Sequence, residues 1–409
     1  MPSFLSKYSD PGSLPAGNGN GVAFSPDGNW VAVAHTTTPF IAVYAWSGSG
    51  FGTKSSNPGT LPVGTGNTIA WSPDGAYVGI VHNTTPFFSI YPVSAGVLGT
   101  RLTSPVTLPA GVSIGIAWSP AGDYVAIAHT TNPRISIYPF SGGAIGTKLS
   151  DPASLPGGNG RYVEWSPDGA YVAIAYSGST TSFDVYNFSG GAIGAKVSGA
   201  PTFSATVGNG VCWSPDGAYI AFAHGSSPYI NVYAWSSGFG SAVSNPSTLP
   251  TGSGNGVRWS PDGSQIAVSH TTSPFVSVYP WSNGFGSKLS DPGTLPAGTG
   301  NEPAWSPDSL TLAIAHTTTP FIAAYSMEEV LAVSTRFQRW MIPAFLRKRY
   351  GDELTFAAPP VVEDETTGSG NSRYDTNALL ANRSRATQRQ REEEEEALAA
   401  FTAFMMNLD

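Results

Sequence analysis

A short turn sequence, an aromatic residue followed by Ser-Pro-x-Gly or a near variant, recurs along the first 326 residues of this 409-residue chain. It begins at seven positions, namely Phe24, Trp71, Trp118, Trp165, Trp213, Trp259 and Trp305. The successive intervals are 47, 47, 47, 48, 46 and 46 residues. Such a period indicates one supersecondary unit that is stacked or arranged radially seven times. The chain is therefore one large repeat domain with a tail, whatever domain count its length alone would suggest.

Each unit contains four short runs with strand character, and no helical period separates them. In the second unit we expect strands at residues 68–71, 77–82 and 87–91, and around Arg101 and Leu102. These are named strands a to d. The Ser-Pro-Asp-Gly sequence between strands a and b favours a tight hairpin, because proline fixes φ, aspartate bonds its own backbone and glycine adopts a left-handed conformation. Four strands in a unit of this length are typical of a propeller blade.

The two ends of the repeat array complement each other. The seventh unit stops at Tyr325 and Ser326 without a strand d, whereas residues 6–20 nearly repeat residues 287–301. We therefore expect the N-terminal segment to supply the missing outer strand of the last unit and so close a ring. The predicted fold class is all-β: a seven-bladed β-propeller over residues 1–326, with an α-helical C-terminal extension.

The turn sequence, the period near 47 residues and the N-terminal closing strand resemble those of WD-repeat and TolB-type β-propellers. The Gly-His and Trp-Asp pairs of true WD repeats are absent, and strand c ends in sequences such as Tyr-Ala-Trp-Ser. The uniform units, with Thr-Thr-Pro-Phe before strand c, are also similar to WD-like propellers of bacteriophage virion proteins. This resemblance implies a structural or partner-binding role in a virion.

Charge separates the repeat domain from the tail. Residues 1–326 hold 9 Lys and Arg and 13 Asp and Glu, while the much shorter remainder holds 10 and 14. The net charge of −8 leaves no basic surplus of the kind that binds nucleic acid. The single cysteine, Cys212, excludes an intrachain disulfide and fits a small buried residue. The chain shows neither a signal-peptide pattern nor an 18-residue apolar run, so we expect a soluble protein without membrane insertion.

After Ser326 the pattern changes to helical spacing. We expect an amphipathic helical segment over residues 327–351 with Phe337 and Trp340 on its apolar side, a linker over residues 352–375, and a charged helix over residues 376–409. Four apolar residues of the last helix follow 3-4-3 spacing: Leu398, Phe401, Met405 and Leu408. Such a side can pack against a partner, so we expect the tail to dock on another protein subunit. A flexible, solvated extension is the alternative.

All six histidines fall at one repeated position, the end of strand b, where the fourth blade has Tyr176; they are His35, His82, His129, His224, His270 and His316. Imidazoles bind metals and titrate near neutrality. Equivalent positions on different blades, however, lie too far apart to share an ion unless they face the axis. We expect each histidine to bond either the backbone or the asparagine that recurs four residues before the turn aromatic. No metal site and no cofactor are predicted.

The residue at the start of strand c follows a proline in most blades and is usually aromatic; the seven candidates are Phe40, Phe87, Arg134, Phe183, Tyr229, Phe275 and Phe321. Two interpretations are open. These residues form a rim that binds a protein or sugar partner. Alternatively they pack between blades, as large apolar residues more often do.

Five charged residues depart from the repeat pattern: Arg134, Arg161, Glu164, Asp184 and Glu302. Four of them lie in blades three and four, which marks those blades as a candidate asymmetric binding patch. Enzymatic propellers gather acids, bases or metal ligands from diverged blades, whereas most acids here are the repeated turn aspartates. Because no nucleophile and base can be paired from their spacing, we predict no catalytic residues and no enzyme.

The sequence thus predicts a non-enzymatic structural and interaction protein. It would display a propeller and be anchored by its tail to other protein subunits, as a component of a bacteriophage virion assembled in the cytoplasm. The alternative is a carbohydrate-binding propeller that recognises a surface glycan or host receptor through the rim residues. A propeller enzyme ranks third.

Overall fold

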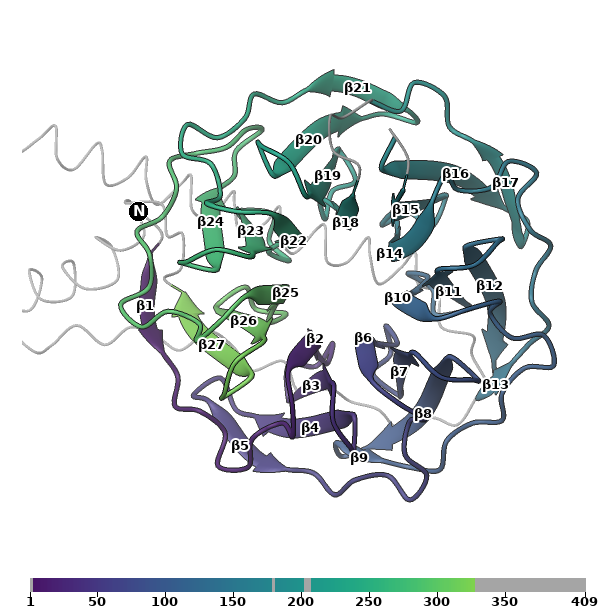
Figure 1. Ribbon diagram of the computed structural model, residues 1–409, viewed down its shortest axis with the longest axis horizontal. Coiled ribbons are helices and arrows are strands. Elements are labelled where there is room, and N and C mark those ends of the chain that lie inside the picture. The colour runs from purple at the N-terminus through teal and green to yellow at the C-terminus, as the bar shows by residue number, and fades with distance from the viewer. Residues whose placement is uncertain (1–2, 179–180, 202–206, 328–409) are drawn as a thin grey trace, which may run out of the picture. The chain divides into compact units, whose positions relative to one another are not determined.

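The computed structural model describes residues 3–178, 181–201 and 207–327. They form seven antiparallel sheets around a central axis, so the expected seven-bladed β-propeller is confirmed (Figure 1). Of the helical segment expected over residues 327–351, Met327 is instead the last residue of a strand, and the rest of that segment, the linker and the charged helix lie outside the described residues. Among the described residues, no helix has the length and hydropathy needed to cross a membrane.

Six blades run from an innermost strand a to an outermost strand d, and blade six has strands a to c. Blades one and two comprise β2 (Gly19–Phe24), β3 (Trp30–His35), β4 (Ile41–Trp46) and β5 (Phe51–Lys54), then β6 (Gly66–Trp71), β7 (Tyr77–His82), β8 (Phe88–Ser94) and β9 (Val97–Leu98). Blades three and four comprise β10 (Ser113–Trp118), β11 (Tyr124–His129), β12 (Ile135–Ser141) and β13 (Ala144–Ile145), then β14 (Asn159–Trp165), β15 (Tyr171–Ser177), β16 (Phe183–Ser189) and β17 (Ala192–Lys196). Blades five and six comprise β18 (Gly208–Trp213), β19 (Tyr219–His224), β20 (Ile230–Trp235) and β21 (Phe239–Ala242), then β22 (Gly254–Trp259), β23 (Gln265–His270) and β24 (Val276–Pro280).

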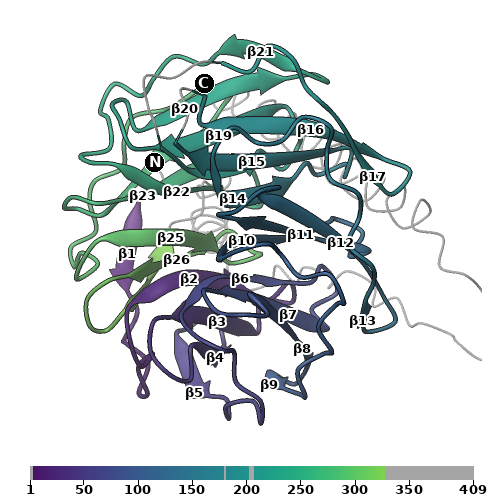
Figure 2. The same cartoon turned by 45° about the vertical axis from the view of Figure 1, so that its right-hand side comes forward.

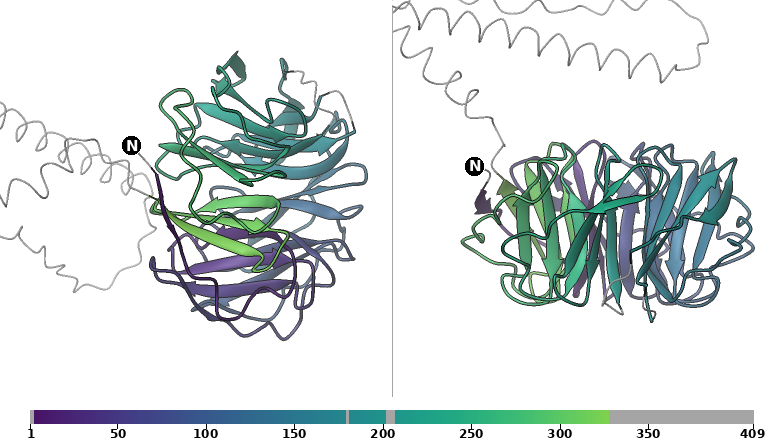
Figure 3. Two further views of the ribbon diagram at one scale, coloured as in Figure 1. Left: turned by 60° about the vertical axis from the view of Figure 1, so that its left-hand side comes forward. Right: turned by 90° about the horizontal axis from the view of Figure 1, so that it is seen from above.

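The seventh blade closes the ring with both ends of the described chain. It contains β25 (Gly300–Trp305), β26 (Thr311–His316) and β27 (Ile322–Met327), and its outer strand is β1 (Phe4–Lys7). β1 pairs antiparallel with β27, with Phe4 opposite Met327 and Lys7 opposite Tyr325. Figure 3 shows this strand lying along the edge of the last blade. The expected N-terminal closing strand is therefore present.

The outer strand is shorter than expected in three blades. In blade two it covers Val97–Leu98 and ends before Arg101, and in blade six only the Trp281–Phe285 bridge remains. These blades and blade three carry a proline in strand c, at Pro92, Pro139 and Pro280. Proline lacks the N–H that a regular ladder requires, so pairing with strand d is interrupted there. Blades one, four and five have Ala or Asn at that position and keep four or five residues in strand d.

The hydrophobic core lies between neighbouring blades. On β3, Val31 and Val33 belong to the cluster shared with blade seven, while Ala32 and Ala34 belong to the cluster shared with blade two. All four side chains are fully buried. Because successive side chains of a strand point to opposite faces, the repeated valine and alanine pattern fills two different interfaces. The blades follow one another in this way around the axis (Figure 2).

The turns between strands a and b have the predicted chemistry. In blade one, Ser25 Oγ donates to Asp27 Oδ1 at 2.5 Å and accepts the Trp30 N–H at 2.9 Å. Gly28 has a φ of 72°, in the left-handed region that glycine adopts without a Cβ clash. These turns set where each strand a ends and strand b begins, and thereby help to place the residues that line the axis.

Candidate functional site: the central channel

The seven innermost strands line a channel along the propeller axis. Three residues before the turn aromatic, most blades have glycine, and one residue before it most have alanine. Small residues are needed because the strands converge there: a Cβ added to Gly115 would lie 2.8 Å from Tyr162 Cα and 2.9 Å from the Arg161 carbonyl oxygen. Large or charged side chains at these positions must therefore project along or across the channel.

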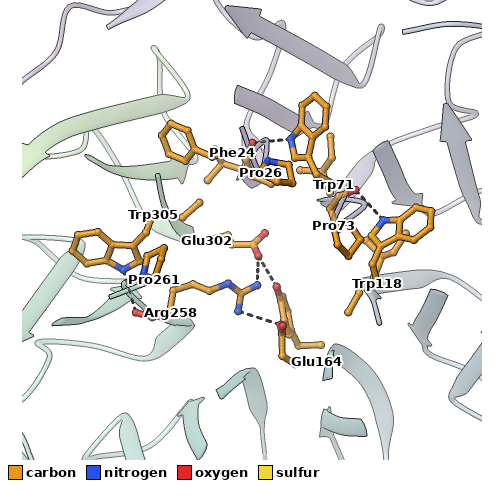
Figure 4. Close-up of a pocket in the computed structure, with 18 of the residues that line it drawn as sticks. Phe24, Pro26, Trp71, Pro73, Trp118, Glu164, Arg258, Pro261, Glu302 and Trp305 are labelled. Atoms are coloured by element: carbon orange, nitrogen blue, oxygen red, sulfur yellow. Dashed lines mark hydrogen bonds and ion pairs between the residues drawn. The ribbon is translucent and has the colours of Figure 1, made fainter. Parts of the chain in front are cut away.

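Four such side chains meet across the axis. Arg258 of β22 donates from Nη2 to Glu302 Oε1 of β25 at 3.1 Å, and Glu302 Oε1 also accepts the Tyr162 hydroxyl at 2.7 Å. The Arg258 guanidinium lies 4.7 Å from the centre of the Tyr162 ring, and its Nη1 is 3.6 Å from Glu164 Oε2. Arg258 thus binds one carboxylate closely and another loosely (Figure 4). We call Tyr162, Glu164, Arg258 and Glu302 the channel cluster.

Burial perturbs the acids of the channel cluster. It raises the pKa of Glu302 to about 7, although the charge of Arg258 opposes the rise. It raises the pKa of Glu164 to about 8, and the neighbouring Glu302 carboxylate adds to the effect. The Glu164 side chain is 30% exposed to the channel, against 8% for Glu302. Water in the channel therefore solvates the Glu164 carboxylate more and opposes the rise of its pKa. The two carboxyl groups can hold and release protons near neutral pH, with Arg258 as their shared counter-charge.

The channel cluster divides the channel into two chambers. Both chambers have volumes of about 310 Å³, and Tyr162 and Glu302 line both of them. The chamber on the side of the Ser-Pro-Asp-Gly turns is walled by alanines, prolines and tryptophan edges, and its charged residues are Glu164, Arg258 and Glu302. Figure 4 shows these two residues and Glu302 surrounded by that apolar wall.

The other chamber opens on the side of the b–c loops and is polar. Five asparagines line it, and each donates from Nδ2 to a backbone carbonyl of the next blade at 2.7–2.9 Å; they are Asn20, Asn67, Asn209, Asn255 and Asn301. These bonds tie neighbouring blades together. The same position is Ile114 in blade three and Arg161 in blade four, and both line the chamber. We call this chamber the channel mouth.

The histidines take structural positions beside strand c. His82 bonds the Thr84 carbonyl through Nδ1 at 2.7 Å and Ser89 Oγ through Nε2 at 3.1 Å. His270 repeats both bonds, with Thr272 and Ser277. The predicted backbone bond is thus present in these two blades. The predicted bond to the recurring asparagine is wrong, because that side chain reaches the next blade instead.

Burial lowers the pKa of five of the six histidines to about 4; these five are His35, His82, His129, His270 and His316. The pKa of His224 is also lowered, for the same reason. Within the described ranges, no three His, Cys, Asp or Glu side chains gather closely enough to hold a metal ion.

Six of the seven rim candidates share one backbone conformation. Their φ angles lie between 68° and 72°, each follows a cis proline, and each carbonyl accepts the N–H of the preceding histidine; the six are Phe40, Phe87, Arg134, Tyr229, Phe275 and Phe321. Their side chains are half-buried. The five aromatic ones do not belong to any of the seven apolar clusters that the described residues form.

Phe183 is a correction to the predicted rim. It lies in β16, is fully buried and stacks on Phe222 with ring centroids 3.7 Å apart. The b–c connection of blade four is one residue longer, so Phe183 aligns with the core position of Ile41 and the rim position falls on Ser182. This blade differs elsewhere too, since the buried Asp184 pairs with Lys196 at 2.5 Å where other blades have serine, asparagine or alanine.

The remaining predicted residues fall into two groups. Arg134 Nη1 donates to the Pro156 carbonyl at 2.5 Å and so braces the adjoining loop. The tail residues lie outside the described residues: Phe337, Trp340, Leu398, Phe401, Met405 and Leu408. The structure brings together two predicted outliers, Glu164 and Glu302, and adds Tyr162 and Arg258, which the sequence reasoning missed. Aligning the strands a position by position would have found both, since each replaces a glycine or alanine of the repeat.

No protein-family model matches the chain, and no curated protein matches it in sequence. Solved structures do resemble it. One of them is hydrazine synthase from Kuenenia stuttgartiensis, with a TM-score of 0.61 and 14% sequence identity. The match covers 79% of this chain and 99% of that one. At this identity the likeness concerns the propeller fold alone.

Proposed function

We propose that this chain is a non-enzymatic structural and interaction protein, which displays its propeller and is anchored in a bacteriophage virion through residues 328–409. The propeller fold, which interaction and structural proteins use, is the established part of this proposal. The uniform repeats and their Thr-Thr-Pro-Phe loops support the virion assignment by resemblance. The change to a charged tail with apolar residues at helical spacing supports the anchor.

The rim is the observation that carries the display role. A bulky residue in the left-handed region costs about 1–2 kcal/mol, and glycine or asparagine would avoid that cost. The chain nevertheless places Phe or Tyr there in five blades. Because these rings lie outside the apolar clusters, we infer that they serve contact with a partner on the b–c face.

The anchor is tested with full-length variants during particle assembly. Phe401→Asp and Met405→Asp place a charge on the proposed apolar side, and Ala403→Asp places the same charge on the opposite side of a helix. We expect the first two variants to be lost from purified particles and Ala403→Asp to be incorporated like the wild type. Equal incorporation of all three would refute the anchor.

The display role is tested on assembled particles. Phe275→Asp and Phe321→Asp should leave incorporation unchanged and reduce adsorption to target cells. Val97→Asp, at a 47% exposed site on the outer strand of blade two, is the matched control and should adsorb normally. Normal adsorption of the two rim variants would remove the rim from the proposal.

A further inference from the structure

Arg161 interrupts the asparagine ring at the channel mouth. It lies on β14 at the ring position, where five other blades have an asparagine that bonds the next blade. The longer arginine side chain does not make the short hydrogen bond that the asparagine Nδ2 donates, so blade four lacks that link to the next blade. The repeat pattern alone does not explain this substitution.

The Arg161 guanidinium has no partner among the described residues. Its Nε is buried without a hydrogen bond, and no described carboxylate lies within ion-pair distance of it. Arg258, which lies in the same channel, is by contrast neutralised by two neighbouring carboxylates, those of Glu164 and Glu302. A half-buried cation without a counter-charge is unfavourable unless an anion binds to it.

The surroundings of Arg161 define the charge of that anion. The channel mouth has a volume of about 310 Å³, at the lower end of small-molecule sites. Its floor contains Glu302, whose Oε1 is already shared by Tyr162 and Arg258. One unpaired cation therefore stands opposite one carboxylate that is already paired. This balance favours a ligand with a single negative charge and disfavours a doubly charged phosphate.

The rest of the wall defines the remainder of the ligand. The five asparagines use one N–H each to bond the next blade, and no described donor binds their side-chain oxygens. The oxygen of an asparagine amide accepts a hydrogen bond from a hydroxyl group, and the second N–H of the amide can donate one to a hydroxyl oxygen. A ring of such groups around a cavity suits a molecule with several hydroxyls.

We propose that the channel mouth binds a small hydroxylated monocarboxylate, of the sugar-acid class, with its carboxylate on the Arg161 guanidinium and its hydroxyls on the asparagine ring. Arg161 supplies the charge-assisted bonds that hold the ligand. The asparagines select a polyhydroxylated body over a simple fatty acid. This site lies on the axis and does not depend on the proposed assembly role.

The test uses full-length protein, isothermal titration calorimetry and four probes: glucuronate, N-acetylneuraminate, neutral glucose and inorganic phosphate. The variant Arg161→Asn restores the ring residue of the other blades, so it should fold and can be checked by its thermal transition. Arg101→Asn makes the same substitution outside the lining of both chambers and is the matched control.

We expect at least one sugar acid to bind the wild type and the Arg101→Asn control equally, with glucose and phosphate binding more weakly. Arg161→Asn should bind that acid about tenfold to a hundredfold more weakly, the loss of a charge-assisted pair. Unchanged binding by Arg161→Asn overturns the assignment of the carboxylate to Arg161. Tighter binding of phosphate overturns the monocarboxylate class. If neither sugar acid binds at concentrations up to about 20 mM, the site itself is overturned.

Discussion

The contribution of a buried histidine to the pH dependence of the unfolding free energy can be measured at His82. Its ring is fully buried, with Nδ1 against the Thr84 carbonyl and Nε2 against Ser89 Oγ. Burial lowers the pKa of His82 to about 4, and the charge of Arg101 adds to the effect. The unfolded chain binds this proton near pH 6.5, well before the native state does. Stability from the neutral ring is therefore complete above pH 6.5 and is lost as the pH falls towards 4.

The size of the effect follows from proton linkage. With a native pKa of about 4 and an unfolded pKa of about 6.5, lowering the pH from 7.5 to 5.5 costs about 1.3 kcal/mol of unfolding free energy at His82 alone. Replacement by glutamine removes the titrating ring and keeps an amide beside Ser89. The pH dependence of stability should therefore be smaller in His82→Gln by about that amount.

Urea denaturation of the wild type and His82→Gln at pH 7.5 and pH 5.5 measures this difference. The wild type should lose about 1.3 kcal/mol more than the variant on acidification. The raised pKa values of Glu164 and Glu302 act in the opposite direction, but they are common to both proteins and cancel. Asn83→Gln, at an exposed neighbour, should retain the full wild-type loss. An equal loss in wild type and His82→Gln would refute the depressed native pKa.

Three further changes test the asymmetric parts of the propeller. Lys196→Met leaves buried Asp184 unpaired and should cost about 3–5 kcal/mol by urea denaturation, whereas adding Asp184→Ser should recover most of the loss. Gly115→Ala forces a Cβ to within 2.8 Å of Tyr162 Cα and should cost about 1–3 kcal/mol, so an unchanged thermal transition would argue against the close approach of strands at the axis. Arg258→Met removes the cation between two carboxyl groups with pKa values of about 7 and 8, so its destabilisation should be larger at pH 8.5 than at pH 5.5, and a pH-independent loss would contradict this.

The sequence was sufficient for the architecture. Seven copies of one turn specify seven blades, because each unit must bury both faces of its sheet against equivalent neighbours. The repeat of residues 287–301 at the N-terminus was sufficient for ring closure, which β1 confirms. The length of strand d was not predicted well. Pro92 shortens it because proline lacks the N–H that would bond strand d at that position, and the sequence alone does not show which of its neighbours strand c bonds there.

The rim and histidine predictions show where repeat alignment reaches its limit. Phe183 was assigned to the rim because the longer loop of blade four shifts the alignment by one residue, and one residue reverses the face of a strand. The recurring asparagines were paired with histidines of their own blade. Both side chains are found at the same end of the propeller, but the asparagine Nδ2 reaches a carbonyl of the next blade.

By itself, the sequence determined that the chain forms a ring of seven blades, because a periodic pattern of turns and core residues is local information repeated seven times. Only the tertiary structure decided which exceptions to that pattern meet. Tyr162 and Glu302 are 140 residues apart and share a hydrogen bond because the ring brings blades four and seven to one axis. Arg161 has no ion-pair partner among the described residues of the same channel for a similar reason: the strands at the axis place other side chains in reach of the two carboxylates. Contacts across the axis depend on strand register and side-chain length together, and neither follows from a period.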